Sequence, residues 1–479
     1  MPVERLKTDI CIIGAGAGGL VVAAVASQLG IDTILIERDK MGGDCLNYGC
    51  VPSKALLAAA HAAETIRSAG RFGLNAGALD IDGHKVFAHV QGAIEAIAPH
   101  DSVERFEDYG VKVILGEGKF TGPREVTVGD QVITARRIVV ATGSGPFVPP
   151  IPGLVETPHF TNETVFEQTD IADHLIVLGG GPIGIELAQA HRQLGAKVTV
   201  LEMASILPND DPAAVAVVRS QLLKEGLDLR EGVKVVATEK TEGGVLVTIE
   251  TTDGKQGISE NISGSHLLVA AGRRPHLSGL DLEKAGIDYA PQGIKVDARL
   301  RTSNKKVFAI GDVAGGHQFT HIAGYHAGIV IRNILFRLPA KVNLSAYPWV
   351  TYTAPELAQV GLTEKAAEAK GLDYRVVNWP LSENDRAITE GNTDGFIKVI
   401  ATPKGHVLGV TIVGRQAGEL IQIWGLAISA KLKIGKIAGM ISPYPTLGEA
   451  NKRAAGEFFK ESLFSDKTRK IVKFLSKFG

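Results

Sequence analysis

The feature that most constrains the fold is a glycine pattern that occurs twice. Each copy fills the three glycine positions of G-x-G-x-x-G, with Gly14, Gly16 and Gly19 in the first copy and Gly179, Gly181 and Gly184 in the second. An apolar run precedes each copy, and a helix-forming run and a second apolar run follow it. In such a strand, turn, helix and strand unit, the glycines let a pyrophosphate approach the backbone at the helix N-terminus. The repetition therefore predicts two dinucleotide-binding units.

An acidic residue closes each of these units. Glu37 and Glu202 each lie 23 residues beyond the first glycine of their copy, where a carboxylate can bind the hydroxyls of a ribose. Glu202 would repel a 2'-phosphate, and Met203 and Ala204 after it offer no arginine to bind one. A nicotinamide bound at the second copy is therefore expected to be NADH rather than NADPH.

Two cysteines lie close together in the segment "GGDCLNYGCVPSK", residues 42–54. In one regular helix Cys45 and Cys50 would be about 7.5 Å apart along the axis, which is too far for a disulfide. The pair can close only if Cys45 precedes the helix proper, and the two glycines before it and Pro52 after it fit that arrangement. The helix dipole and the charge of Lys54 would then stabilise a thiolate. The segment is predicted to be a reactive site.

The third cysteine, the net charge and the lack of long apolar runs limit which classes of protein the chain can belong to. Cys11 lies in the apolar run "ICIIG" and is expected to be a small core residue. A metal site at the cysteine pair would need further soft ligands, so no metal is expected. The net charge of -1 argues against a nucleic-acid partner. No signal-peptide pattern and no long apolar run occur, and a cytoplasmic enzyme is expected.

The segment "GGDCLNYGCVPSK" resembles the redox-active segment of the flavin-dependent pyridine nucleotide-disulfide oxidoreductases, especially dihydrolipoamide dehydrogenase and mercuric reductase. The resemblance covers almost the whole chain. Four further motifs occur in the family's order, which are "ARRIVVATGS" (135–144), "VAAGRRP" (269–275), "KVFAIGDVAG" (306–315) and "VTYTAPELAQVGLTE" (350–364). The resemblance implies an α/β fold with two Rossmann-like domains, one for FAD and one for NAD, and a C-terminal α+β dimerisation domain.

The resemblance also implies roles for individual residues. Cys50 would be the thiolate beside the flavin, Cys45 the sulfur that meets the substrate, and Lys54 a flavin contact paired with Glu186. The FAD site would comprise Gly14, Gly16, Gly19, Glu37, Gly43, Thr142, Gly143, Gly311 and Asp312. The NAD site would comprise Gly179, Gly181, Gly184, Glu202 and Gly272. A helix cap is the structural alternative for Asp312.

The family's order of domains implies four segments. Residues 1–150 and 275–345 would form the FAD-binding domain, 151–274 the NAD-binding domain and 346–479 the interface domain. The prolines and glycine of "VPPIPG" (148–153) mark the first crossing. Because the family completes each active site with a loop of the other subunit, the resemblance implies a homodimer.

One position departs from the family's pattern. Members acting on lipoamide or glutathione have a histidine followed by proline, threonine and a glutamate, whereas this chain has Tyr444 before Pro445, Thr446 and Glu449. A phenol is a poor proton acceptor at neutral pH, so dihydrolipoamide oxidation should be slowed by about 100-fold or more. In this respect the chain resembles mercuric reductase, which has tyrosine at the matching position. However, the cysteine pair near the C-terminus of mercuric reductase does not occur in this sequence. Tyr444 or a histidine among His317, His321 and His326 could supply the missing base.

Three functions stay open at this point. The first is electron transfer between NAD(H) and a small or protein-bound disulfide or dithiol, in either direction. The second is reduction of metal ions or quinones, and the third is a redox-sensing flavoprotein with little turnover. Separately, residues 465–479 predict a basic amphipathic helix that could contact a membrane or a partner protein, although packing within a dimer is the expectation.

Overall fold

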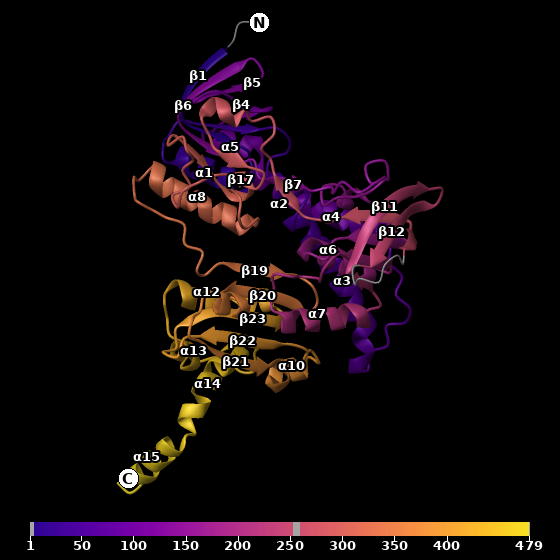
Figure 1. The fold of residues 1–479 in the computed structure, drawn as a ribbon, viewed down its shortest axis with the longest axis vertical. Coiled ribbons are helices and arrows are strands. Elements are labelled where there is room, and N and C mark those ends of the chain that lie inside the picture. The colour runs from indigo at the N-terminus through magenta and orange to yellow at the C-terminus, as the bar shows by residue number, and fades with distance from the viewer. Residues whose placement is uncertain (1–3, 252–258, 479) are drawn as a thin grey trace. The chain divides into compact units, whose positions relative to one another are not determined.

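The computed structural model describes residues 4–251 and 259–478 of the chain (Figure 1). Its contacts divide the chain into two compact units. The first unit comprises Met1–Gly179, Gln193–Leu201 and Val233–Val342. The second unit comprises Gly180–Arg192, Glu202–Gly232 and Asn343–Gly479.

A 7-stranded sheet lies in the first unit. Its strands are β1 (Glu4–Ile13), β2 (Thr33–Glu37), β3 (Lys112–Leu115), β4 (Lys119–Gly122), β5 (Glu125–Val128), β6 (Gln131–Val140) and β18 (Val307–Ala309). Their order is β3-β2-β1-β6-β5-β4, and β18 also pairs with β6. Strands β1, β2, β3, β6 and β18 pair in parallel, whereas β4, β5 and β6 pair antiparallel. Helix α1 (Ala17–Gln28) connects β1 to β2, as a parallel pair requires.

The last four residues of β1, 10–13, are buried on both faces of the sheet, which explains their continuous apolar sequence. Ile10 and Ile12 belong to one hydrophobic cluster, which includes side chains of α1 and α8 (Thr320–Ile334). Cys11 and Ile13 belong to a second cluster. Cys11 is fully buried, and burial raises the pKa of its thiol to about 12. The prediction that Cys11 is a core residue is therefore confirmed.

The second glycine pattern lies in another parallel arrangement. Strands β8 (His174–Leu178), β9 (Lys197–Glu202) and β14 (His266–Val269) pair in the order β9-β8-β14. Helix α6 (Pro182–Gln193) connects β8 to β9. An antiparallel sheet of β11 (Val233–Thr241), β12 (Gly244–Thr251) and β13 (Ser259–Gly264) shares a core with β8 and β14. The predicted pair of Rossmann-like units is confirmed.

A 5-stranded antiparallel sheet forms the centre of the second unit. Its strands are β19 (Pro348–Thr351), β20 (Glu356–Gly361), β21 (Arg375–Pro380), β22 (Phe396–Ala401) and β23 (Val407–Gly414), in the order β19-β20-β23-β22-β21. Helices α11 (Ala417–Leu420), α12 (Gln422–Ser429), α13 (Ile434–Ala438) and α14 (Glu449–Leu463) share its core. This arrangement confirms the predicted α+β domain.

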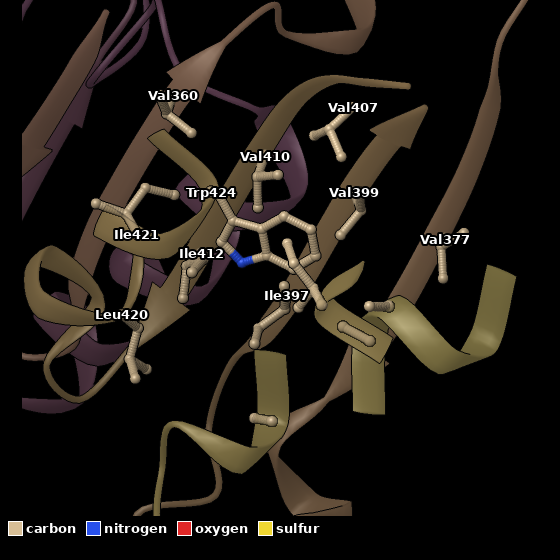
Figure 2. Close-up of a cluster of buried hydrophobic side chains, with 14 of the residues drawn as sticks. Val360, Val377, Ile397, Val399, Val407, Val410, Ile412, Leu420, Ile421 and Trp424 are labelled. Carbon is tan, nitrogen blue, oxygen red and sulfur yellow. The ribbon is translucent and has the colours of Figure 1, made fainter. Parts of the chain in front are cut away.

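Trp424 lies in the core of the second unit. Figure 2 shows its indole ring among Val399, Val410 and other buried side chains of the sheet. The Trp424 Nε1 donates a 2.7 Å hydrogen bond to Asn451 Oδ1, and Asn451 Nδ2 donates one of 3.0 Å to the Leu420 carbonyl. A buried polar group without a partner costs about 1–3 kcal/mol. These bonds therefore fix α12 against α14.

The remaining elements complete the two units. In the first unit they are α2 (Gly43–Asn47), α3 (Cys50–Arg67), α4 (Gly83–Ile97), α5 (Val103–Asp108), β7 (Ser144–Pro146), β15 (Arg273–Pro275), β16 (Tyr289–Ala290) and β17 (Gly293–Ile294). In the second they are α7 (Pro212–Lys224), β10 (Asp228–Glu231), α9 (Glu364–Ala369), α10 (Asp385–Thr389) and α15 (Asp466–Leu475). Within residues 4–251 and 259–478, no helix combines the length and apolarity that a bilayer crossing needs.

Candidate functional site

The first glycine turn connects β1 to α1 and is shaped by close backbone contacts. Gly14 has a φ of +107°, and a Cβ at this position would lie 2.4 Å from the carbonyl oxygen of Ala141. A Cβ on Gly19 would lie 1.9 Å from the carbonyl oxygen of Gly14. Real Cβ atoms do not approach so closely. The packing of the turn therefore requires glycine at both positions.

Gly16, the middle glycine of this turn, is not required by packing. The nearest atom to a Cβ at Gly16 would be the Cα of Gly43, at 3.9 Å. Gly16 lines a cleft that is partly open to solvent, a form that small-molecule sites take. A Cβ at Gly16 would occupy space that a ligand can use.

Most residues predicted to bind FAD line this same cleft. They are Gly14, Gly16, Glu37, Gly43, Thr142 and Gly143. Asp44 and Tyr48, from the cysteine segment, also line it. Gly19, Gly311 and Asp312 are not among the residues that the structure describes in this lining. The nucleotide motif and the cysteine segment thus meet at one cleft.

Glu37 ends β2 and holds the first turn in place. Its buried carboxylate accepts a 2.6 Å hydrogen bond from the Ala15 amide at Oε2 and a 2.8 Å hydrogen bond from the Asp39 amide at Oε1. Each carboxylate oxygen has two lone pairs, so both can accept a further hydrogen bond. Glu37 therefore fixes the turn and can still accept from a ribose hydroxyl.

The second glycine turn, after β8, repeats these roles. Gly179 has a φ of +116°, and a Cβ there would lie 2.5 Å from the carbonyl oxygen of Ala270. No described atom lies within 4 Å of a Cβ built at Gly181. Gly184 is buried within α6. As in the first turn, packing requires the first glycine, and the middle glycine leaves open space.

Glu202 makes the same contacts as Glu37. Its Oε2 accepts a 2.7 Å hydrogen bond from the amide of Gly180, and its Oε1 accepts one of 2.9 Å from the amide of Ala204. Gly180 follows the first glycine of its turn, as Ala15 does in the first turn. The two acidic residues therefore have a structural role that the ribose interpretation did not include.

The two cysteines lie on separate helical segments. Cys45 is in α2, a single short turn of helix that ends at Asn47, and Cys50 is the first residue of α3. The chain leaves helical geometry at Tyr48 and Gly49 between them. Pro52 lies in the first turn of α3, as predicted. Cys45 thus precedes the main helix as expected, although it lies in a helical turn rather than an irregular segment.

The two thiols differ strongly in acidity. The hydrogen bond from Cys45, the Thr320 hydroxyl and the charge of Lys54 together lower the pKa of Cys50 to about 6, against the effect of burial. The same hydrogen bond and burial raise the pKa of Cys45. Cys50 is therefore the more acidic thiol of the pair.

Thr320 is a site residue that the sequence interpretation missed. Its Oγ1 lies 3.2 Å from the Cys50 sulfur, and it is the first residue of α8. A hydroxyl can donate to a thiolate from this distance. Its position eight residues beyond Asp312, at the start of a helix, was the available sequence signal.

Lys54 and Glu186 were predicted to act as a pair. Lys54 lies one turn beyond Cys50 on α3, and its Nζ lies 3.4 Å from Ser53 Oγ. Glu186 is buried on α6, and its Oε1 accepts a 2.9 Å hydrogen bond from the Tyr352 amide. The pairing of Lys54 with Glu186 stays a prediction.

Asp312 belongs to a partly buried polar network beside the cysteine segment. It lies in a short 3-10 helix (Gly311–Ala314), and its Oδ2 accepts a 2.6 Å hydrogen bond from Ser144 Oγ. The Arg273 guanidinium donates to Ser144 Oγ and to its carbonyl, at 2.9 and 2.7 Å, and pairs with Asp44 at 3.1 Å. Burial raises the pKa of Asp312 against the effects of Ser144 and Arg273. Arg273 therefore links Asp44, next to Cys45, to the Asp312 segment.

Two further glycines were predicted to bind cofactors. Gly311 has a φ of +68°, and a Cβ there would lie 3.1 Å from the Ala323 Cβ. Gly272 has a φ of +120°, with no described atom within 4 Å of a Cβ built on it. Left-handed backbone explains glycine at both positions. Their cofactor contacts stay predictions.

Two family models match most of the chain. Residues 8–327 match the family model described as pyridine nucleotide-disulphide oxidoreductase, and residues 347–455 match the dimerisation domain of that family. The chain belongs to the pyridine nucleotide-disulphide oxidoreductase family. It is therefore a flavin-dependent oxidoreductase that uses FAD and NAD(H).

Proteins similar to this chain include dihydrolipoyl dehydrogenases and mercuric reductases. A dihydrolipoyl dehydrogenase of Thermus scotoductus is 37% identical, over 96% of this chain and 99% of that protein. A mercuric reductase of Bacillus cereus is 34% identical, over 95% of this chain and 72% of that protein. Among solved structures, the Cu(II) complex of the HOCl-induced flavoprotein disulfide reductase RclA from Escherichia coli matches with a TM-score of 0.82 and 27% identity, covering 93% of this chain and 99% of RclA.

The residues of the oxidoreductase fit FAD at the first glycine turn. The open space at Gly16, the free lone pairs of Glu37 and the left-handed Gly43 together form a cleft for a dinucleotide. A Cβ at Gly43 would lie 2.7 Å from the Cα of Gly16, so this position also requires glycine. The cleft reaches Asp44, the residue before Cys45.

Tyr444 replaces the histidine of the family pattern. Its side chain is 67% exposed, and its hydroxyl donates a 2.8 Å hydrogen bond to Asp385 Oδ2. This hydrogen bond and the charge of Asp385 raise the pKa of Tyr444. Glu449 begins α14, and its Oε1 accepts a 2.9 Å hydrogen bond from Arg453 Nε. At neutral pH Tyr444 is thus even less ionised than a free phenol, and its hydroxyl is not available as a base.

The histidines near α8 do not form a metal site in the part of the chain that is described. His326 is buried, and its Nδ1 accepts a 3.2 Å hydrogen bond from the Gly311 amide. Burial lowers the pKa of His326 to about 4, and burial also lowers the pKa of His317. The His321 ring packs against Phe319, with 5.3 Å between ring centroids. His326 therefore makes a polar contact, from within α8, with the first residue of the 3-10 helix Gly311–Ala314.

Proposed function

We propose that this oxidoreductase transfers electrons between NAD(H) and a disulfide or dithiol through a reversible Cys45–Cys50 disulfide. The observation that carries the proposal is the asymmetry of the pair. The Thr320 hydroxyl lies 3.2 Å from the Cys50 sulfur, and the pKa of Cys50 is lowered while that of Cys45 is raised. Thiol–disulfide exchange requires a thiolate, so a pair with one stabilised thiolate is suited to it.

The two cofactors have separate sites in this proposal. When bound, FAD accepts a hydride from NADH and passes an electron pair to a disulfide. The residues that would hold FAD are Gly14, Gly16, Gly19, Glu37, Gly43, Thr142, Gly143, Gly311 and Asp312. The residues that would hold NAD(H) are Gly179, Gly181, Gly184, Glu202 and Gly272. Lys54 supplies positive charge near Cys50, with Glu186 as its partner, and Glu202 favours NADH because it repels a 2'-phosphate.

Cys45 and Cys50 act in separate steps of the thiol–disulfide exchange with the acceptor. Deprotonated Cys45 attacks one sulfur of the acceptor disulfide, which forms a mixed disulfide and releases one thiolate. The Cys50 thiolate then attacks the Cys45 sulfur, which closes the Cys45–Cys50 disulfide and releases the second thiolate. The acceptor gains two electrons from the cysteine pair, the proton that Cys45 loses and one further proton from solvent.

The proposal extends to domains, assembly and location. Residues 1–150 and 275–345 form the FAD-binding domain, 151–274 the NAD-binding domain and 346–479 the interface domain. The match of residues 347–455 to the family's dimerisation domain supports a homodimer. A cytoplasmic location suits a cysteine pair that must open to dithiol in each cycle.

A second candidate is the reduction of a metal ion or a quinone. The observation that favours it is the Tyr444 hydroxyl, which is held by Asp385 and is unable to act as a base near neutral pH. A soft metal ion binds thiolates directly, so its delivery does not require the histidine that disulfide exchange uses. The mercuric reductase relatives and the Cu(II) complex of RclA support this alternative.

Thiol counting tests the central proposal. Adding NADH to the oxidised holoenzyme without oxygen should expose two thiols to Ellman's reagent. Cys45→Ser and Cys50→Ser should abolish this gain, whereas Cys11→Ala should keep it because Cys11 is buried in the core. Steady-state assays with lipoamide, glutathione disulfide, Hg(II), Cu(II) and quinones then rank the acceptors. Disulfide turnover that survives the loss of both cysteines would overturn the proposal.

A further inference from the structure

Helix α15 (Asp466–Leu475) presents an apolar face that is exposed in the structure. Its face consists of Ile471, Val472, Phe474 and Leu475, and Phe478 extends it just beyond the helix. Their exposed fractions run from 48% to 73%. The spacing of 471, 474, 475 and 478 places these side chains along one stripe. Figure 1 draws α15 beyond α14, at the yellow end of the ribbon.

The opposite face of α15 is strongly basic. Residues 466–478 contain five basic residues and one acidic residue, Asp466. By helical spacing Arg469, Lys470, Lys473 and Lys477 fall on this face together with Asp466, whereas Lys467, four residues before Ile471, falls in line with the apolar stripe. Arg469 lies 3.9 Å from Asp466 and is 70% exposed. The spacing of 470, 473 and 477 places three lysines on the side away from the apolar stripe. An apolar stripe flanked by several cations is the pattern of helices that lie in a membrane interface.

The positive charge of α15 favours a phospholipid surface over a second copy of the chain as the partner of the apolar stripe. Packing the same face of a second copy against it would bring two basic helices together, which like charges disfavour. The family's dimerisation domain matches residues 347–455 and ends before α15 begins. An anionic phospholipid surface complements both the apolar stripe and the basic residues.

We propose that α15 binds the oxidoreductase reversibly to anionic phospholipid membranes, with the apolar stripe inserted at the interface and the lysines at the headgroups. The exposed Leu463 and Phe464, just before α15, extend the apolar surface. Because attraction to headgroups is screened by salt, binding weakens as ionic strength rises. The inference is independent of the reaction at the cysteine pair.

Vesicle co-sedimentation of the full-length holoenzyme tests this proposal. We expect binding to vesicles of phosphatidylcholine with phosphatidylglycerol, and much less to phosphatidylcholine alone. A basic residue at an anionic surface changes binding by about fivefold, so Lys470→Glu with Lys473→Glu should weaken it by more than tenfold. Phe474→Ser with Ile471→Ser should also abolish sedimentation. NADH-dependent turnover in solution should stay unchanged in both variants.

Matched controls separate the helix from general surface effects. Lys234→Glu with Lys240→Glu makes the same change in net charge at exposed positions of β11 and should retain vesicle binding. Val155→Ser with Leu74→Ser removes exposed apolar side chains elsewhere and should also retain it. Equal binding to both vesicle types, or equal losses in the controls, would overturn the proposal. Absence of vesicle binding would also overturn it. Dissociation of the dimer after deletion of residues 465–479 would then show that the apolar stripe packs within the dimer.

Discussion

The hydroxyl oxygen of Thr320 lies 3.2 Å from the sulfur of Cys50, although 270 residues separate them in the sequence. Cys50 begins α3 and Thr320 begins α8, so two helix N-termini meet at this sulfur. A helix N-terminus carries partial positive charge and favours an anion. This convergence explains why Cys50, rather than Cys45, is the thiolate.

Replacing Thr320 tests its part in this stabilisation. Thr320→Val removes one donor to the thiolate, and a hydrogen bond to a charged group is worth enough to raise the pKa of Cys50 by about one unit. The pH dependence of iodoacetamide alkylation at Cys50 in the reduced protein measures that pKa. Thr320→Ser keeps the hydroxyl and should preserve the wild-type profile. A Thr320→Val profile that matches the wild type would contradict the role.

The pKa of about 6 for Cys50 predicts a specific pH dependence of reactivity. At pH 7 about nine-tenths of a thiol with this pKa is ionised, against about one-hundredth for a thiol near 9. Alkylation of Cys50 should therefore rise as pH increases through 6 and be nearly constant above 7. Mass spectrometry of the modified peptide distinguishes Cys50 from Cys45, which should react only at high pH. Half-maximal reactivity of Cys50 near pH 9 would refute this assignment.

Arg273→Leu tests the network that links Asp44 to Asp312. The substitution leaves two partly buried carboxylates without their cation, and leaving such groups without a partner should cost about 1–3 kcal/mol. The midpoint of urea unfolding should fall accordingly. Arg136→Leu is the control, because Arg136 pairs with Asp9 at 2.8 Å on the surface and is 68% exposed, so its loss should cost less than about 1 kcal/mol. Equal effects of the two substitutions would argue against a special role for Arg273.

Gly19→Ala tests the packing of the first glycine turn. The added Cβ would lie 1.9 Å from the Gly14 carbonyl oxygen, so the turn must shift, and both FAD retention and thermal stability should fall. Gly92→Ala is the matched control, because Gly92 lies within α4 and no described atom is within 4 Å of a Cβ there. That control should stabilise the protein by about 0.5–1 kcal/mol. Full flavin content in Gly19→Ala would show that the turn tolerates a side chain.

Tyr444→His tests whether proton transfer limits lipoamide turnover. An imidazole at this position can accept the thiol proton near neutral pH, so dihydrolipoamide oxidation should rise about tenfold or more. Tyr444→Phe should leave turnover within about twofold, because the phenol held by Asp385 is not the base. Steady-state kinetics with dihydrolipoamide and NAD provide the measurement. A large loss in Tyr444→Phe would mean that the hydroxyl itself takes part.

Much of the fold could be predicted because its signals are local. The glycine turns depend on backbone contacts at Gly14 and Gly179 within short strand, turn and helix units, and the sequence contains each unit in full. Cys11 could be assigned to the core because its apolar neighbours belong to the same strand. Motifs of this kind carry their own geometry in the order of their residues.

Local residue patterns specified the two dinucleotide units and the cysteine pair, because residues near in the chain form them. The tertiary structure added the contact of Thr320 with Cys50, which spans 270 residues. It also decided that Arg273 joins Asp44 to the Asp312 segment, and that Asp385 holds the Tyr444 hydroxyl. Contacts of this range arise when separate helices and strands pack together, and no local pattern of residues specifies them.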